Sequence, residues 1–307
     1  MKKTIFLLCI FLILPVYAAD YKSEQLDNSY DHDKWGTSSK CIVKDFRAYR
    51  SCFDNTDDNN GDGSPDLWGV PKWVAYEMRR INKSCVSTYE RPGVWITDKD
   101  LFVQGIMPDD KSYAYPKAFT SSHKDWFSRG HLAMKMHAER MGGSAGWNTH
   151  TFYNAVPQRQ LFNAGIWLDL EDLTAAWAQK YGAVWIIDGP IFADKSPNAY
   201  IGEEGEFPVA IPDAFFKIVI KEGMVTNKPD ILAFIYPQVG AGYYEGKPYD
   251  HSRYMTSIDE IQKLTGLEFL KNIPAANRKV LIKQNIREVW PADKKDFIKA
   301  CGRKYNE

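Results

Sequence analysis

The chain has 307 residues, 44% of them hydrophobic, and its 39 basic residues balance 39 acidic ones. This neutral balance argues against tight, charge-driven binding of nucleic acid, because proteins that bind in that way are usually strongly basic. It does not exclude an enzyme that combines a locally basic groove with a metal ion.

The first 18 residues have the pattern of a secretory signal peptide. Lys2 and Lys3 precede an apolar run, and Val16-Tyr17-Ala18 is a small-residue cleavage site. The run is shorter than the roughly 20 residues that a membrane-spanning helix needs. We therefore expect a secreted or periplasmic protein that has no membrane attachment once the signal is cleaved. Removing the two lysines from 39 basic and 39 acidic residues leaves a formal charge of −2.

Four cysteines follow the signal, at Cys41, Cys52, Cys85 and Cys301. An even number in an exported chain favours disulfide bonds, with three alternative connectivities that the sequence leaves open. We expect two bridges, one of which ties Cys301 to the N-terminal part. Because no Cys-x-x-Cys occurs, a zinc ribbon or a thioredoxin-like redox site is not expected.

Residues 19–70 are expected to be an N-terminal extension, irregular up to about residue 53, on a main domain of residues 71–307. The extension contains an Asp-rich loop with oxygen-bearing side chains at alternating positions, Asp58, Asn60, Asp62, Ser64 and Asp66. This spacing resembles the first part of an EF-hand calcium loop, although Gly69 stands where the bidentate glutamate belongs. The loop is either a structural Ca²⁺ site completed by a ligand from elsewhere or a solvated acidic turn.

Alternating aromatic and aliphatic residues predict the strands of the main domain. Strands are expected at Pro71 to Met78, Val94 to Thr97, Ala183 to Phe192, within Val209 to Ile220, and at Ile231 to Tyr236. Residues 106–126 are predicted to form a surface loop. Ser257 and Glu260 have the capping-box spacing that opens a short helix.

The segment 163–181 has apolar residues at helical spacing and no proline, so it predicts a helix. Asn163, Trp167 and Glu171 share one face of it, with about 12 Å between the first and the last at 1.5 Å per residue. Glu171 is expected to lean toward Asn163, so that both serve one hydrated metal ion. In the alternative interpretation Asn163 caps the helix and Glu171 is a solvated surface residue.

The chain contains an ordered set of further motifs, namely Trp73-Val-Ala-Tyr76, Arg129-Gly-His131-Leu132, Asn154-x-x-Pro157-Gln158, Asn163 with Trp167 and Glu171, Asp188-Gly-Pro190, and Ser257 to Gly266. Together these motifs make the chain resemble the DNA/RNA non-specific endonucleases, the ββα-metal nucleases, from about Pro71 to Pro274. The resemblance implies an α+β fold in which helices flank a central, mainly antiparallel sheet.

The resemblance also implies an endonuclease that uses Mg²⁺, or Mn²⁺, to cleave DNA and RNA into products with 5′-phosphates. His131 would be the general base, because an imidazole that is neutral near pH 7 suits that task. Asn163 would bind the metal directly, and Glu171 would hold one of its waters. Arg129 would clamp the scissile phosphate, and Asn154 would orient the histidine loop or a phosphate oxygen.

Ser128, Arg159 and Trp167 are the predicted substrate-binding residues. Most family members have aspartate where Ser128 stands, and many bacterial members have an arginine where Ala175 stands. That phosphate contact is therefore either lost or supplied by Arg159 or by a residue of the tail from Lys271, which is rich in Lys and Arg. Trp167 could stack on a base, although a tryptophan on an amphipathic helix is more often part of the core.

Ser128, Ala175, the neutral charge and the Asp-rich loop also support a hypothesis from another class. In it the chain is a calcium-stabilised binding or effector protein that keeps the nuclease fold without its activity. The resemblance further suggests a homodimer, as in many relatives. The histidines outside the Arg129-Gly-His131 motif are interpreted as surface or hydrogen-bonded core residues. His123 is close enough to this motif to line the substrate groove.

Overall fold

A computed structural model of the chain describes residues 20–22, 29–38, 40–53, 58, 67–82, 91–113, 126–223, 228–240, 243 and 248–293. The predicted signal peptide, Cys85, Cys301, His123 and most of the Asp-rich loop lie outside these residues. Of that loop only Asp58 is described, in a cavity that it shares with Lys40 and Lys72. Among the helices of the described part, none has the length and apolar character needed to cross a bilayer.

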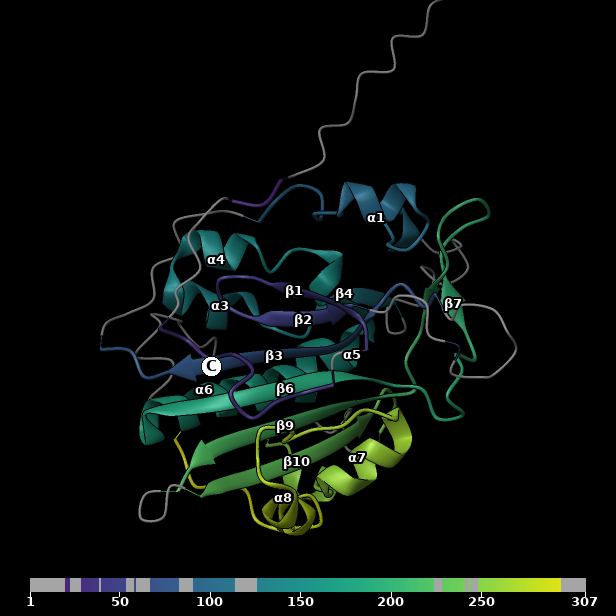
Figure 1. The fold of residues 1–307 in the computed structure, drawn as a ribbon. Coiled ribbons are helices and arrows are strands. Elements are labelled where there is room, and N and C mark those ends of the chain that lie inside the picture. The colour runs from purple at the N-terminus through teal and green to yellow at the C-terminus, as the bar shows by residue number, and fades with distance from the viewer. Residues whose placement is uncertain are drawn as a thin grey trace, which may run out of the picture.

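A six-stranded sheet in which every neighbouring pair is antiparallel forms the centre of the molecule (Figure 1). In spatial order its strands are β1 (Ile42–Asp45), β2 (Arg50–Phe53), β3 (Pro71–Arg79), β6 (Ala183–Ile191), β9 (Ala214–Glu222) and β10 (Pro229–Pro237). The last four strands were predicted from their runs of aromatic and aliphatic residues, and the structure confirms them.

The hairpin of β1 and β2 lies within the segment that was expected to be irregular, and that expectation is wrong. Its four-residue strands are too short to show a convincing alternation, yet β2 pairs with β3 and buries Cys52 and Phe53. A disulfide joins Cys41 to Cys52 across the hairpin. The N-terminal extension therefore contributes two strands to the central sheet.

The strand predicted at Val94 to Thr97 is also wrong. Ile96 forms a single parallel bridge with Thr151, and its backbone N–H donates to the carbonyl of His150 at 2.8 Å. The pairing ends there because Asp98 caps the helix α1 (Lys99–Val103) two residues later. This short contact nevertheless brings two loops that are distant in sequence together beside His131.

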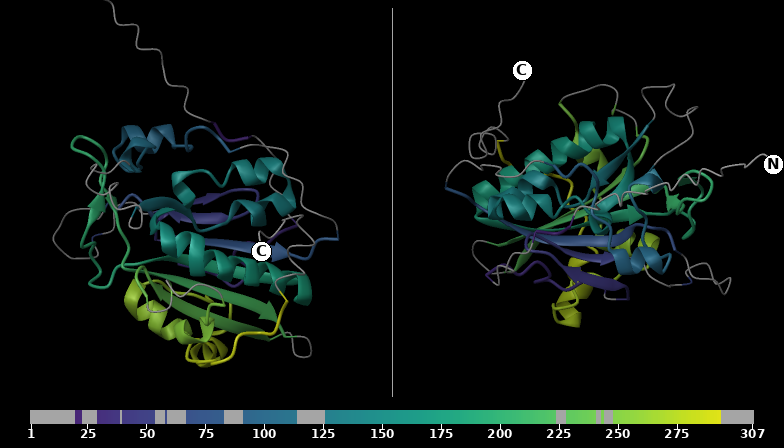
Figure 2. Two further views of the ribbon diagram at one scale, coloured as in Figure 1. Left: turned by 180° about the vertical axis from the view of Figure 1, so that it is seen from behind. Right: turned by 90° about the horizontal axis from the view of Figure 1, so that it is seen from above.

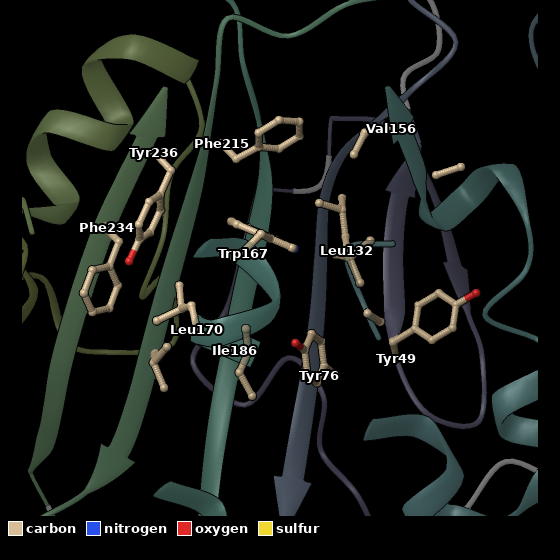
Figure 3. Packing of buried hydrophobic residues seen from close by; sticks show 14 of the residues in the cluster. Tyr49, Tyr76, Leu132, Val156, Trp167, Leu170, Ile186, Phe215, Phe234 and Tyr236 are labelled. Atoms are coloured by element: carbon tan, nitrogen blue, oxygen red, sulfur yellow. The ribbon is translucent and has the colours of Figure 1, made fainter. Parts of the chain in front are cut away.

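Hydrophobic clusters fill both faces of the sheet. Helices lie on both of these faces (Figure 2). On one face the helix α6 (Leu168–Tyr181) packs against β3 and β6, with Leu170 near Tyr76 and Ile186 (Figure 3). On the other, Ile258 and Ile261 of α7 (Ile258–Thr265) belong to a second cluster. The Ser257 hydroxyl caps α7 by accepting the N–H of Glu260, as predicted. Each large apolar side chain buried in this way contributes about 1.5–3 kcal/mol.

A separate two-stranded ribbon precedes α6 and carries the Arg129-Gly-His131 motif. Its strands are β4 (Phe127–His131) and β5 (Ala155–Arg159), with Ser128 opposite Gln158 and Arg129 opposite Pro157. The predicted helix then follows as α5 (Gln160–Phe162), a π-type turn η4 (Asn163–Trp167) with a non-helical Gly165, and α6. The fold is thus α+β, with a ribbon and a helix side by side.

The remaining elements are short and connect these layers. They are η1 (Lys111–Tyr113), α3 (Lys135–Ala138), η2 (Glu139–Met141), α4 (Gly143–Trp147), η3 (Phe152–Asn154), β7 (Tyr200–Ile201), β8 (Val209–Ala210), η5 (His251–Tyr254) and α8 (Ala275–Leu281).

Candidate active site

The ribbon and the start of the helix form the walls of one cavity of about 770 Å³. Ser128, Arg129 and His131 of β4 line it from one side, and Asn163 and Glu171 line it from the other. The two groups of residues are about 30 positions apart in the sequence, and folding brings them together. The cavity therefore combines the predicted base and phosphate clamp with the predicted metal-binding residues.

His131 is half-buried at this cavity, and its Nε2 atom is enclosed without a hydrogen-bond partner in the described part of the chain. Burial, assisted by the positive charges of Arg91 and Lys135 and by the neighbouring His150, holds the pKa of His131 well below its usual range. The imidazole is consequently neutral near pH 7, which is the form that can accept a proton.

Asn154 holds the loop that follows His131. Its Oδ1 accepts the backbone N–H of Ala133 at 2.7 Å, and its Nδ2 donates to the carbonyls of Ala133 at 2.8 Å and Thr149 at 2.9 Å. The side chain is completely buried. The expected alternative contact with a phosphate oxygen is therefore wrong, since the amide lies away from the cavity and its donors and acceptor are used within the protein.

Asn163 directly follows α5 with helical backbone angles, φ −60° and ψ −48°, and precedes the kink at Gly165, so it does not cap the start of a helix. Glu171 is only 4% exposed, which excludes the interpretation as a solvated surface residue. An amide oxygen and a buried carboxylate in one cavity fit Mg²⁺, which prefers oxygen ligands and keeps several of its waters. Among the described residues no group of three or more His, Cys, Asp or Glu side chains could hold a metal ion.

Two buried polar contacts fix the start of the helix that carries these residues. The Oδ2 of Asp169 lies 3.0 Å from Nε2 of His251, whose Nδ1 lies 2.9 Å from the hydroxyl of Tyr236. On the same segment, the Lys217 ammonium lies 4.2 Å from the ring centroid of Trp167. His251 is thus a hydrogen-bonded core residue, as predicted, and the helix is attached to both β9 and β10.

Arg129 and Ser128 are held at the edge of the cavity. The guanidinium of Arg129 forms an ion pair with Asp110 at 3.0 Å, and each side chain is about one-third exposed. The hydroxyl of Ser128 donates to Oε1 of Gln160. A phosphate oxygen could replace Asp110 on Arg129 without rearrangement of the ribbon, because the arginine remains accessible to solvent.

The structure does not bring two predicted substrate-binding residues into the cavity. Trp167 is completely buried among aromatic rings, including that of Phe215 (Figure 3), so the prediction that it stacks on a base is wrong. Arg159 does not line the cavity. Its guanidinium instead lies 5.4 Å from the ring centroid of Phe127, with which Arg159 pairs at the end of the ribbon.

Among the cavity-lining residues that the sequence did not indicate, Arg91, Trp126 and Lys135 are suited to contact a nucleic acid. Trp126 is 44% exposed and directly precedes β4, where its carbonyl accepts the N–H of Gln160 at 3.0 Å. Trp126 and Ser128 are two residues apart on an extended chain, so alternation could have placed both on one face. No local signal marks Arg91, because it is distant in sequence from β4 and from the helix.

This arrangement, a two-stranded ribbon with His131 followed by a helix with Asn163 and Glu171, is the fold of the ββα-metal nucleases. Residues 28–276 match the model of the DNA/RNA non-specific endonuclease family, and the chain belongs to that family.

Similar proteins agree with this assignment. Mitochondrial endonuclease G of Bos taurus is 25% identical over 232 residues, covering 70% of this chain and 75% of the relative. Mitochondrial nuclease 1 of Schizosaccharomyces pombe is 28% identical over 279 residues, covering 77% and 78%. A crystal structure of an EndoG/EndoGI complex has the same fold, with a TM-score of 0.52 at 18% identity, over 79% of this chain and 91% of the other.

Proposed function

We propose that the protein is a Mg²⁺-dependent endonuclease that hydrolyses phosphodiester bonds in both DNA and RNA. Family membership supports the reaction class. The observation that carries the finer proposal is the single cavity in which neutral His131 faces the same space as Arg129, Asn163 and Glu171. Metal-assisted phosphodiester hydrolysis needs a general base, a positively charged side chain at the phosphate and oxygen ligands for a metal ion, and this cavity contains all three kinds of group.

In this proposal His131 accepts a proton from the attacking water, because its imidazole is neutral at working pH. The water oxygen forms a bond to phosphorus, and the bond between phosphorus and the 3′ oxygen breaks. The leaving 3′ oxygen takes up a proton from solvent, so the products carry a 5′-phosphate and a 3′-hydroxyl. Arg129 donates to a phosphate oxygen and stabilises the charge that grows there, exchanging Asp110 for the substrate.

Asn163 would hold Mg²⁺ through its amide oxygen, and Glu171 would hold one of the metal-bound waters. When bound, the ion neutralises charge on the phosphate and on the leaving oxygen. Mn²⁺ would substitute because it accepts the same oxygen ligands. A structural Ca²⁺ in the Asp-rich loop remains a separate proposal.

The substrate contacts are proposed to come from residues that the fold places at the cavity. Arg91 and Lys135 contribute positive charge next to His131. Trp126 presents an accessible ring at the same cavity, where a base could stack on it. These residues replace Arg159 and Trp167 in the predicted set.

Export to the periplasm or the medium is also part of the proposal. It rests on the signal pattern of residues 1–18, and the bridge between Cys41 and Cys52 supports it because disulfides persist in oxidising compartments. Cell fractionation with N-terminal sequencing of the mature protein tests it. A product that keeps residues 1–18 and stays in the cytoplasm would contradict export.

The enzyme proposal is tested with supercoiled plasmid and with RNA, each incubated with the mature protein and Mg²⁺, then with added chelator. We expect both substrates to be cleaved with Mg²⁺ and neither with chelator, and the DNA ends to be substrates for a polymerase that needs a 3′-hydroxyl. His131→Ala should lose about 10²–10⁴-fold in rate. If Mg²⁺ and Mn²⁺ both leave the substrates intact, the calcium-stabilised binding protein on an inactive fold becomes the better explanation.

A further inference from the structure

Two aromatic side chains lie directly against the imidazole of His131. The ring of His150 meets it edge-on, with centroids 4.9 Å apart and planes at 88°. The indole of Trp95 lies 4.8 Å from His131 and 5.4 Å from His150, so the three rings form a closed triangle. None of the sequence motifs indicated this cluster, because Trp95 and His150 are distant from His131 along the chain.

Both supporting rings are attached to fixed parts of the fold. His150 is 1% exposed, and its Nδ1 lies 3.3 Å from the carbonyl of Trp147. The backbone N–H of Trp95 donates to Asp110 at 3.3 Å, and the bridge between Ile96 and Thr151 joins the two loops. The rings therefore have little freedom to move away from His131.

We propose that His150 and Trp95 are positioning residues that set the orientation of the His131 imidazole in the cavity. The inference rests on the proposed role of His131 as general base. Catalytic histidines are commonly oriented by a hydrogen bond to their second nitrogen. Here ring packing from two sides performs that task, and the edge-to-face contact with His150 favours one ring orientation.

The charges around His131 bear on the protonation state of the neighbouring His150. Arg91 and Lys135 act on both histidines, and the carboxylates of Glu139 and Glu171 line the same cavity. Lys135 is paired with Glu139 at 2.8 Å. Burial, reinforced by Arg91, lowers the pKa of His150 to about 4, so at neutral pH this residue supplies a ring and no charge. Its removal would open the site to water.

The test combines kinetics with an NMR titration of the imidazoles in the full mature protein. His150→Phe keeps a ring, whereas His150→Ala removes it, and Trp95→Leu removes the second ring independently. We expect His150→Ala and Trp95→Leu to lower kcat by about 10–100-fold, the size of effect that a small misplacement causes, with KM little changed. The pKa of His131 should rise toward its usual value in both variants, while His150→Phe should restore most of kcat.

His32→Ala is the matched control, because His32 is a half-buried histidine that is bonded to the carbonyl of Arg47 and does not line the cavity. It should reduce stability and leave both kcat and the His131 titration unchanged. Unaltered kcat and pKa in His150→Ala and Trp95→Leu would overturn the inference. So would a His150→Phe variant as poor as His150→Ala, since a nitrogen would then be needed. An inactive wild type would refute the proposed reaction, while the NMR titration would still decide whether the rings position His131.

Discussion

A Cβ atom placed on Gly130 would lie 2.1 Å from Oε1 of Gln158, which is closer than any real contact. Gln158 is completely buried on the neighbouring strand of the ribbon, so it cannot swing aside into solvent. The glycine between Arg129 and His131 is therefore required by the packing of this glutamine. The two motifs that flank the cavity, one on each strand, depend on each other through this contact.

Replacing Gly130 by alanine should consequently destabilise the protein by about 1–3 kcal/mol, the usual cost of overpacking. It should also lower kcat, because β4 carries both Arg129 and His131. The double variant Gly130→Ala with Gln158→Ala should recover part of the stability, since the clashing atoms are gone. Urea unfolding of the wild type, both single variants and the double variant measures the coupling. Additive effects would show that the predicted clash is absent.

The pH dependence of cleavage should reflect the low pKa of His131. The base acts in its neutral form, so kcat/KM falls only when pH drops below this lowered pKa. The acidic limb of the profile should therefore lie below pH 6.5, the usual value for a histidine. Lys135→Gln removes a nearby positive charge and should move that limb to higher pH.

Lys34→Gln is the control for this measurement, because Lys34 pairs with Glu222 away from the cavity. It should leave the profile where it is. A wild-type acidic limb at or above the ordinary histidine value would contradict the role of His131 as a buried neutral base.

Several strands and the long helix could be predicted from the placement of their apolar residues. β3 and β6 are short segments rich in aromatic and aliphatic residues, and α6 has apolar residues at helical spacing. The role of Trp167 could not be predicted in the same way. Nearly every residue from Asp169 to Ala178 is buried, including Glu171, so periodicity does not distinguish a core face from a site face.

The sequence also could not reveal the cluster of rings at His131. Trp95 and His150 approach it only because a single bridge joins Ile96 to Thr151, and a one-residue pairing leaves no periodic pattern. The site residues that could be predicted are those on β4 and on the helix, where short local spacing is preserved. Contacts created by the folding of loops have no such local signature.

The proposed metal site of Asn163 and Glu171 should determine how the reaction depends on the Mg²⁺ concentration. Asn163→Ala removes the proposed direct ligand, and Glu171→Gln keeps the size of the side chain but removes its charge. We expect Glu171→Gln to weaken metal affinity by about 10–100-fold, as is typical for groups that hold metal-bound water. Mn²⁺ binding followed by electron paramagnetic resonance gives a readout independent of cleavage.

Asn148→Ala is a suitable comparison for this pair, because the amide of Asn148 bonds the backbone of Lys22 outside the cavity. Its Mn²⁺ affinity should equal that of the wild type. Equal affinity in Asn163→Ala and the wild type would place the metal elsewhere.

Trp126 and Trp167 should respond to mutation in opposite ways. Trp126→Ala should weaken the binding of single-stranded substrates by about 1–3 kcal/mol if a base stacks on this exposed ring. Trp167→Ala should instead cost about 3–5 kcal/mol in stability, because it empties a fully buried site. Comparison of KM with urea unfolding separates the two effects. A raised KM in a stable Trp167 variant would restore the original stacking prediction.

The last prediction concerns the buried ion pair beneath the start of the helix. The ammonium of Lys217 lies 2.6 Å from Asp188, both side chains are inaccessible to solvent, and burial raises the pKa of Asp188 to about 6 even beside this lysine. Lys217→Met leaves the carboxylate without its partner, so we expect a loss of about 3–5 kcal/mol at neutral pH.

Removing Lys217 raises the folded pKa of Asp188 further above its unfolded value. A group raised in this way stabilises the fold at low pH and loses that contribution as pH rises through its folded pKa. The deficit of Lys217→Met should therefore be small at pH 5 and large at pH 8. Adding Asp188→Leu removes the stranded charge and should recover most of the stability at pH 8. Urea unfolding at both pH values tests this, and a deficit that is the same at each would show that Asp188 is not the group responsible.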